Sequence, residues 1–220
     1  MRDTCPLSPE ECVHKDELAK LRMRVTELST QVITDELTGL FNYRHLIHTL
    51  GLEIERVRRS GGEFSILIVD FDNFKALNDT YGHEFGNKVL RTAGTFYLKS
   101  LRKLDVPCRF GGEEFVIVLP GTGLREAVLL AERLRKGVES LPLVSDTGKV
   151  LVTVSTGVDV FRARDQVTAD QLINRADKQL LIAKRMGKNT VCFPDYSDRS
   201  GGMSVDERDA LMDGFSRQRS

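Results

Sequence analysis

Residues 106–119 read VPCRFGGEEFVIVL, two apolar segments on either side of a Gly-Gly pair. Apolar runs rich in β-branched and aromatic residues, separated by a short glycine turn, are typical of a β-hairpin. We therefore predict strands over 106–110 and 113–119, joined by a tight turn at Gly111 and Gly112. Two acidic residues follow that turn directly.

The period of the apolar residues predicts further elements on both sides of this hairpin. Apolar residues that recur every three or four positions predict helices at 42–59, 87–101, 124–138 and 169–186. Continuous apolar runs predict strands at 64–71, 150–160 and 190–193. The central order is β-α-β-β-α-β, which predicts a ferredoxin-like α/β sandwich, an α+β fold around a mostly antiparallel central sheet.

The chain divides into three parts by composition. Residues 1–33 contain an N-terminal amphipathic helix, residues 34–193 the domain just described, and residues 194–220 a polar stretch that we interpret as a flexible tail. The N-terminal helix has a heptad seam, which favours a parallel two-stranded coiled coil and a homodimer. The alternative is a single helix packed on its own domain. The seam consists of Leu18, Leu21, Val25, Leu28 and Val32.

Charge and hydropathy exclude several classes of protein. Lys and Arg total 32, as do Asp and Glu, so a strongly basic nucleic-acid-binding domain is not expected. Every apolar run is far shorter than the ~18–20 residues that cross a bilayer, so we expect no membrane span. The polar N-terminus lacks the apolar core of a signal peptide, which predicts a cytoplasmic protein.

Acidic residues follow two of the predicted strands. Asp70 and Asp72 lie at the end of strand 64–71, and Glu113 and Glu114 follow the glycine turn. The first and third strands are the two middle ones of a ferredoxin-like sheet, so these carboxylates can converge. Clustered carboxylates favour a hard cation such as Mg²⁺, bound together with substrate phosphates. The alternative is a set of ordinary acidic turn residues, although neighbouring glycines favour a ligand that approaches the backbone.

The sequence RFGGEEF at 109–115 resembles the signature of GGDEF-domain diguanylate cyclases in its GGEEF form. Other family motifs are resembled in order by DELTGLFN at 35–42, DFDNFKALNDTYGH at 70–83 and ADK…AK…GKN within 176–189. The family joins two GTP molecules into cyclic di-GMP and releases two pyrophosphates. The 3′-hydroxyl of each GTP attacks the α-phosphate of the one held by the facing domain, so orientation across a homodimer supplies much of the rate.

The resemblance implies roles for residues at matching positions. Asp70, Glu113 and the Phe71 carbonyl would ligate Mg²⁺, for which Mn²⁺ could substitute. Glu114 would assist the metal or activate the 3′-hydroxyl, so the catalytic residues would be Asp70, Glu113 and Glu114. The remaining GTP contacts would come from the glycines beside the acidic pair, a helix start, lysines near the phosphates and an amide at the guanine edge: Gly111, Gly112, Phe74, Lys75, Lys184, Lys188 and Asn78.

One position departs from the family pattern at the guanine edge. The family usually has Asp where this sequence has Asn87, and an Asp accepts hydrogen bonds from both guanine N1–H and N2–H. A mismatched buried hydrogen bond costs about 1–3 kcal/mol. Asn87 could rotate or use a water and keep GTP as the substrate. Alternatively, Asn87 could weaken guanine discrimination and allow a mixed guanine–adenine dinucleotide.

A second site is implied just before the signature. Arg102 and Asp105 match the R-x-x-D inhibitory site of the family, and Arg133 lies where a further inhibitory-site arginine is often found. An arginine and an aspartate together suit a guanine base. We therefore expect cyclic di-GMP to act as a product inhibitor here. The alternative is a surface ion pair.

Two further hypotheses concern activity and partners. A non-catalytic cyclic di-GMP receptor would be expected to have a damaged signature, whereas Asp70, Glu113, Glu114 and Lys184 are all present. A regulatory protein could bind the N-terminal helix, since its apolar seam would otherwise be exposed.

Overall fold

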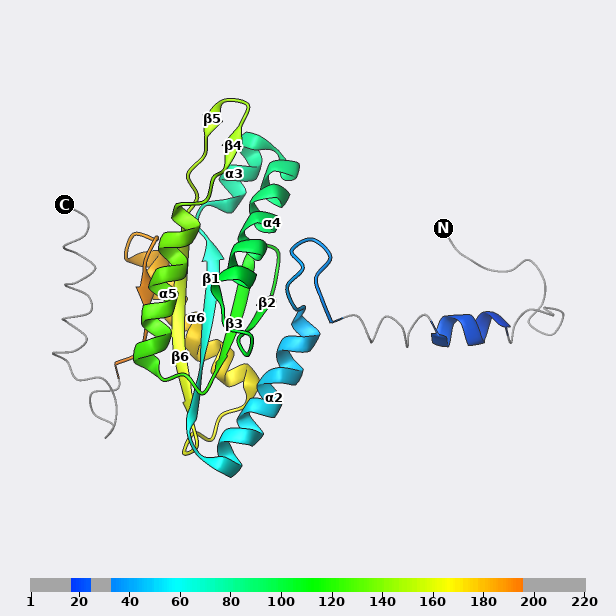
Figure 1. Ribbon diagram of the computed structural model, residues 1–220, viewed down its shortest axis with the longest axis vertical. Helices are drawn as coiled ribbons and strands as arrows, with labels where there is room; N and C mark the ends of the chain where they lie inside the picture. The colour runs from blue at the N-terminus through cyan, green and yellow to red at the C-terminus, as the bar shows by residue number, and fades with distance from the viewer. Residues whose placement is uncertain (1–16, 25–32, 196–220) are drawn as a thin grey trace. The chain divides into compact units, whose positions relative to one another are not determined.

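The computed structural model describes residues 17–24 and 33–195 (Figure 1). Contacts divide the chain between Ile33 and Thr34, so the helix at 17–24 is described by itself. The predicted tail lies outside the described residues from residue 196 onward. Within the described ranges, no helix combines the length and the apolar composition that a bilayer crossing needs.

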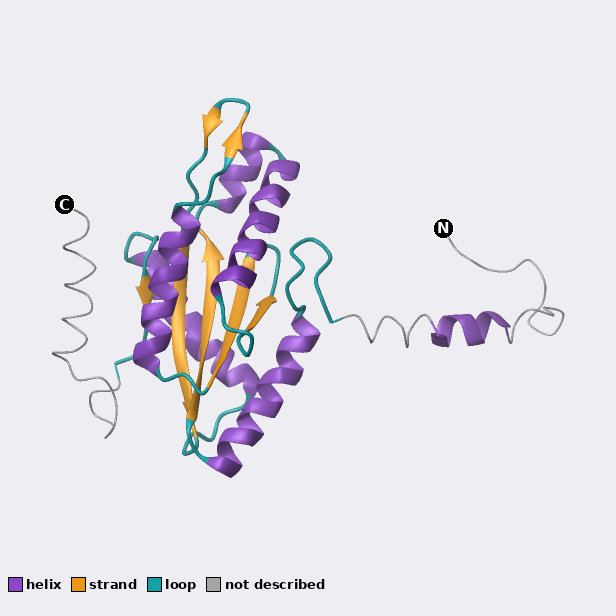
Figure 2. Cartoon of the chain, in the orientation of Figure 1, coloured by secondary structure: helices purple, strands orange, loops and turns teal. Residues whose placement is uncertain are grey.

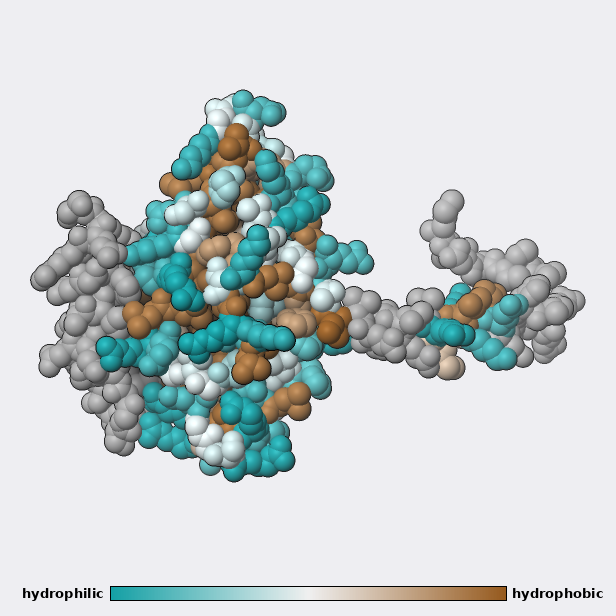
Figure 3. Space-filling model, viewed as in Figure 1, coloured by the Kyte–Doolittle hydropathy of each residue, from teal (hydrophilic) through white to brown (hydrophobic). Residues whose placement is uncertain are grey.

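Residues 17–24 are helical, as the heptad pattern predicts. Leu18, Leu21 and Met23 are exposed on this helix, among hydrophilic side chains (Figure 3). The rest of the predicted seam lies outside the described residues: Val25, Leu28 and Val32.

A five-stranded sheet forms the centre of the domain (Figure 2). Its order is β2-β3-β1-β6-β7; β1 is antiparallel to both β3 and β6, and β7 is parallel to β6. The ferredoxin-like, mostly antiparallel sheet that the sequence predicts is therefore confirmed. The strands are β1 (Glu63–Phe71), β2 (Val106–Arg109), β3 (Glu114–Pro120), β6 (Val154–Arg162) and β7 (Val191–Cys192).

Helices cover both faces of the sheet (Figure 1). Alternate side chains of β1 point to opposite faces, so Leu67 and Val69 pack in the core under α4 and α5 while Ile66 and Ile68 pack under α2 and α6. The helices are α2 (Tyr43–Ser60), α3 (Phe74–Tyr81), α4 (His83–Ser100), α5 (Leu124–Glu139) and α6 (Ala169–Arg185).

The structure differs from the sequence prediction around residues 72–87. The helix predicted from 87 begins at His83 and is preceded by a separate helix, α3. Gly82 divides the two, with φ 83° and its N–H bonded to the Asn78 carbonyl. Glycine adopts this left-handed backbone without strain.

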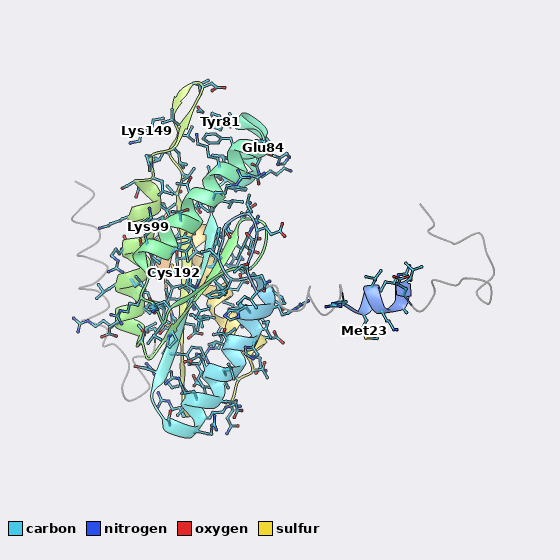
Figure 4. The ribbon with its side chains drawn as sticks, turned by 45° about the vertical axis from the view of Figure 1, so that its right-hand side comes forward. Met23, Tyr81, Glu84, Lys99, Lys149 and Cys192 are labelled. Carbon is cyan, nitrogen blue, oxygen red and sulfur yellow. The ribbon has the colours of Figure 1, made fainter. Side chains whose placement is uncertain are left out.

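Residues 144–153 also differ from the prediction. The strand predicted from 150 begins at Val154, and the chain before it forms the small hairpin of β4 (Val144–Ser145) and β5 (Gly148–Lys149). Lys88 of α4 donates to the Val144 carbonyl at 3.0 Å. Tyr81, Glu84 and Lys149 therefore lie at the same end of the domain (Figure 4).

The glycine turn is wider than predicted. The N–H groups of Phe110 and Gly111 both donate to the Glu114 carbonyl, at 2.9 and 3.2 Å. The bond from Phe110 therefore encloses Gly111, Gly112 and Glu113 in the turn. Neither Gly111 nor Gly112 has a left-handed φ. A Cβ on Gly112 would meet nothing within 4 Å, so this part of the turn is open to a ligand.

Helix α6 packs directly on β6 at Gly157. A Cβ there would lie 2.2 Å from the Ala176 carbonyl oxygen and 2.3 Å from the Leu180 nitrogen. These backbone atoms could not yield without moving the helix, and overpacking of this kind destabilises a fold. Gly157 thereby sets the distance between the sheet and the helix that carries Lys184.

Candidate active site

The acidic residues of the two middle strands meet at one end of the sheet. The register places Asp70 of β1 opposite Glu114 of β3, with Glu113 immediately before Glu114. Asp70 is only 5% exposed. Lys184 reaches it from α6, with its Nζ 2.8 Å from Asp70 Oδ1. The predicted convergence of these groups is present in the structure.

Burial and mutual repulsion both act on these carboxyl groups. Burial raises the pKa of Asp70 although Lys184 lowers it, and the charges of Asp72 and Asp177 raise it further. Burial and the Asp70 charge likewise raise the pKa values of Glu113 and Glu114, against the effect of Lys184. A single lysine thus serves a cluster of acidic groups.

The carboxylates of Asp70, Glu113 and Glu114 fit a hard divalent cation, because they offer only oxygen atoms as ligands. Within the described parts of the chain, no three His, Cys, Asp or Glu side chains lie close enough to hold an ion by themselves. Two carboxylates and a backbone carbonyl would leave coordination positions for water and phosphate oxygens, which is how Mg²⁺ is usually bound.

Asp72 lies near enough to Asp70 for its charge to raise the pKa of that group, and its own carboxylate makes structural hydrogen bonds. Its carboxylate accepts hydrogen bonds from Thr153 Oγ1 and Ser155 Oγ, both at 2.7 Å, and from the Asn189 N–H at 2.9 Å. Asp72 therefore fastens the end of β1 to the start of β6 and to the turn after α6. No role for Asn189 was predicted, because it is remote from Asp72 in the sequence.

The start of α3 provides a second polar feature. Asn73 precedes the helix with φ 57°, and its side chain makes no capping bond to the helix backbone. Lys188 Nζ donates to Asn73 Oδ1 at 2.5 Å, and Lys75 is exposed in the first turn. Free N–H groups at a helix start and nearby lysines favour an anion. Phe74 packs against Phe71, so its ligand contact would come from its backbone N–H.

A buried amide oxygen lies between α3 and α4. Asn78 Oδ1 has no hydrogen-bond partner within the described part of the chain, and a Cβ on Gly86 would lie 1.9 Å from it. An unsatisfied buried polar group costs about 1–3 kcal/mol, so a ligand N–H would be stabilised here. Asn87 follows Gly86 and is half-buried. The sequence prediction missed Gly86, whose only signal was its place beside Asn87.

Arg109 shapes the glycine turn, a role that the sequence prediction did not assign. Its Nη2 donates to the Gly112 carbonyl at 2.8 Å and its Nε to the Gly111 carbonyl at 3.1 Å. Its Nη1 contacts both carboxylate oxygens of Asp35, at 3.2 and 3.1 Å. Asp35 also accepts from the Thr38 N–H and hydroxyl. The turn is thereby tied to the first residues of the domain.

The residues of the predicted inhibitory site surround a separate pocket. Asp105 is 8% exposed and accepts from the Arg102 N–H at 2.8 Å. Arg133 of α5 donates to the Ser100 carbonyl at 3.1 Å. The cavity has a volume of about 200 Å³ and is lined by Arg102, Asp105, Thr122, Glu126, Leu129, Leu130 and Arg133.

The fold and the site define a class of protein, a ferredoxin-like α/β domain whose acidic strand ends suit a divalent cation and whose helix start suits phosphate. Residues 32–190 match the family model described as "Diguanylate cyclase, GGDEF domain". The chain therefore belongs to the GGDEF-domain diguanylate cyclase family, and the resemblance seen in the sequence is confirmed.

Several curated proteins are similar to the chain. Response regulator PleD of Caulobacter vibrioides is 36% identical over 196 residues, which cover 84% of this chain and 43% of PleD. Diguanylate cyclase DgcS of Shewanella oneidensis is 34% identical over 191 residues, covering 84% of this chain and 62% of DgcS. The chain thus spans less than two thirds of these relatives.

Solved structures have the same fold. Diguanylate cyclase SiaD from Pseudomonas aeruginosa, in complex with its activator SiaC, has a TM-score of 0.71 at 37% identity, covering 84% of this chain and 71% of SiaD. The coiled coil and GGDEF domain of DgcB from Caulobacter crescentus, in complex with c-di-GMP, also has a TM-score of 0.71, at 26% identity over 81% of this chain and 94% of that one.

The contact between Arg109 and Asp35 makes a prediction about acid stability. Burial raises the pKa of Asp35, but the Thr38 hydrogen bonds and the Arg109 charge outweigh it and lower the pKa below its ordinary value of 3.8. The stabilisation is therefore present above pH 3.8 and is lost as the pH falls through the lower folded-state pKa. Asp35→Asn should lower the free energy of unfolding by about 1 kcal/mol near neutral pH.

Urea unfolding followed by circular dichroism at a series of pH values measures this difference. The gap between wild type and Asp35→Asn should stay constant down to about pH 5 and close below 3.8. Glu36→Gln, at the exposed neighbouring position, is the control and should show no gap. A gap that persists or widens in acid would contradict the assignment.

Proposed function

We propose that the protein is a diguanylate cyclase that condenses two GTP molecules into cyclic di-GMP and releases two pyrophosphates. The observation that carries the proposal is an acidic cluster with a lysine beside it. Glu113 and Glu114 of the intact GGEEF sequence lie next to Asp70 of β1, and Lys184 of α6 contacts Asp70. Membership of the family and the relatives named diguanylate cyclases support it. The intact cluster argues against a receptor without activity.

The acidic cluster would hold Mg²⁺, or Mn²⁺ in its place, through Asp70, Glu113 and the Phe71 carbonyl. The ion would supply activation of the attacking hydroxyl and charge neutralisation at the leaving pyrophosphate. Glu114 accepts the proton of the 3′-hydroxyl. Without the ion, burial and the Asp70 charge raise the pKa of Glu114, whereas a bound divalent cation would lower it.

The rest of the site binds and orients GTP. The backbone at the start of α3 and the Lys75, Lys184 and Lys188 side chains bind the phosphates. Lys184 contacts Asp70, Lys188 contacts Asn73 at the start of α3, and Lys75 is exposed in the first turn of that helix. Asn78 and Asn87 bind the guanine edge. The unpartnered Asn78 Oδ1 accepts a guanine N–H, which removes the cost of leaving it buried and unsatisfied.

Product analysis tests the proposal. The full chain, freed of bound nucleotide, is incubated with Mg²⁺ and equimolar GTP and ATP, and the products are identified by mass spectrometry. We expect cyclic di-GMP, and we expect Glu113→Gln to lower its rate of formation about 100-fold or more. Glu36→Gln is the matched control at an exposed position and should behave as wild type.

The other outcomes of this experiment are equally informative. A mixed guanine–adenine dinucleotide would make Asn87 a specificity determinant and would overturn strict GTP use. No product at any protein concentration, with cyclic di-GMP still binding, would overturn the proposed activity in favour of a receptor.

The pocket around Arg102, Asp105 and Arg133 is proposed to bind cyclic di-GMP as a product inhibitor. The guanidinium of Arg102 would bind guanine O6 and N7, and the Asp105 carboxylate would accept from N1–H and N2–H. The about 200 Å³ cavity that these residues share supports this. The structure of the DgcB domains in complex with c-di-GMP shows that a similar protein binds this dinucleotide.

Arg102→Ala should raise the cyclic di-GMP concentration needed for half-inhibition about tenfold or more, since it removes a charged bidentate contact. Lys103→Ala is the control, because Lys103 is an exposed cation next in sequence that does not line the pocket. Inhibition curves from pyrophosphate release provide the measurement. Equal shifts in both variants would indicate a general charge effect and would reject the site.

The helix at 17–24 is proposed to bring two copies of the chain together. Its exposed Leu18 and Leu21 are the described part of the apolar seam. A dimer is needed chemically because each domain holds one GTP, and the 3′-hydroxyl of each GTP attacks the GTP held by the facing domain. A regulatory protein is the other proposed user of this helix, supported by the structure of SiaD in complex with its activator.

Leu21→Asp should weaken the dimer, because it places a charge in the seam. Ala19→Asp introduces the same charge at an exposed position off the seam and should leave association unchanged. Sedimentation velocity over a range of protein concentrations measures both. A wild-type chain that stays monomeric at every concentration would exclude dimerisation by this helix. Binding of a regulatory protein would then be the remaining proposal for the helix.

A further inference from the structure

The turn after α6 has an unusual backbone. Gly187, Lys188 and Asn189 are consecutive and have φ values of 111°, 66° and 46°. A left-handed conformation is strained for a lysine, whereas an asparagine tolerates it better than most residues. The turn therefore needs contacts from its surroundings to hold Lys188 in this conformation.

Asn189 is held from three sides. Its backbone N–H donates to Asp72 Oδ2 at 2.9 Å. Its Oδ1 accepts from Arg135 Nη1 at 2.5 Å, and its Nδ2 donates to Glu139 Oε1 at 3.2 Å. Two of these contacts come from α5, which lies outside the acidic cluster.

Arg135 is also held by hydrogen bonds to other residues of α5. It is 5% exposed, and its Nε and Nη2 donate to the two carboxylate oxygens of Glu132 at 2.9 and 2.6 Å. Its Nη1 also donates to Glu139 Oε2 at 3.0 Å. A planar guanidinium can make these bonds at the same time, whereas a lysine ammonium cannot reproduce the fork.

Lys188 lies between Asn189 and the start of α3. Its Nζ contacts Asn73 Oδ1 at 2.5 Å, beside the free N–H groups of that helix. We infer that Arg135 is a positioning residue that acts through Asn189 to hold Lys188 at the phosphate-binding start of α3. The inference rests on the proposed function for the phosphate role of Lys188, and it assigns to α5 a part in substrate binding without contact to substrate.

Steady-state kinetics of the full chain test this role. Arg135→Lys should raise the KM for GTP about tenfold and change kcat less than about threefold, because a misplaced phosphate contact weakens ground-state and transition-state binding alike. Arg125→Lys is the same substitution at an exposed position in the first turn of α5 and should leave both constants unchanged. A fall in kcat at constant KM would overturn the inference.

A second variant protects the test against misfolding. Asn189→Gly removes the side chain that Arg135 binds while the left-handed backbone stays available. It should raise KM in the same way as Arg135→Lys. An unchanged KM in Asn189→Gly would show that the contact from α5 does not matter for GTP.

A double-mutant cycle separates positioning from a general loss of stability. If Arg135 acts through Lys188, Arg135→Lys should raise KM no further in a Lys188→Ala background. Fully additive effects would mean that the two residues act independently and would reject the inference.

Hydrogen exchange gives a readout that needs no turnover. The backbone amides of residues 187–190 should exchange about tenfold faster in Arg135→Lys than in wild type or Arg125→Lys, because one restraint on the turn is lost. Unchanged exchange would overturn the positioning role. If the wild type makes no cyclic di-GMP, the proposed function fails, yet exchange still decides whether Arg135 holds the turn.

Discussion

The pairing of β1 with β3 is the constraint on which the rest of the structure depends. It places Asp70 opposite Glu114 at the end of the two central strands, where burial raises the pKa values of both and the Asp70 charge raises that of Glu114 further. When acidic groups are held this close together, their charged forms repel one another unless a cation lies nearby. Lys184 supplies one charge from α6, and the close approach of α6 to the sheet at Gly157 makes that contact geometrically possible.

Two hydrogen-bonded residues keep the segments around this cluster in place. Arg109 binds the carbonyl groups of the glycine turn and joins it to Asp35 at the beginning of the domain. Asp72 joins the end of β1 to β6 and to the turn that carries Lys188. The glycine turn and the turn after α6 are therefore each anchored by charge-assisted bonds, which are stronger than neutral ones.

Much of this could be predicted from sequence, because apolar period and strand order depend on local composition. The two middle strands, and hence the meeting of Asp70 with Glu113 and Glu114, followed from topology alone. The short helix α3 and the two-residue strands β4 and β5 have too few apolar positions to show a period. Contacts such as Arg109 with Asp35, 74 residues apart, and Arg135 with Asn189, 54 apart, leave no local pattern.

Helix α5 shows why such contacts matter for the arrangement of the sites. Arg133 and Arg135 are two positions apart, so they point to different sides of the helix, one toward the pocket near Ser100 and the other toward Asn189. The apolar face of α5, with Ala127, Val128 and Leu134, lies in the main core. The packing of the core thus fixes the helix independently of either arginine contact, and the same rigid element carries residues of the proposed inhibitory pocket and of the proposed positioning contact.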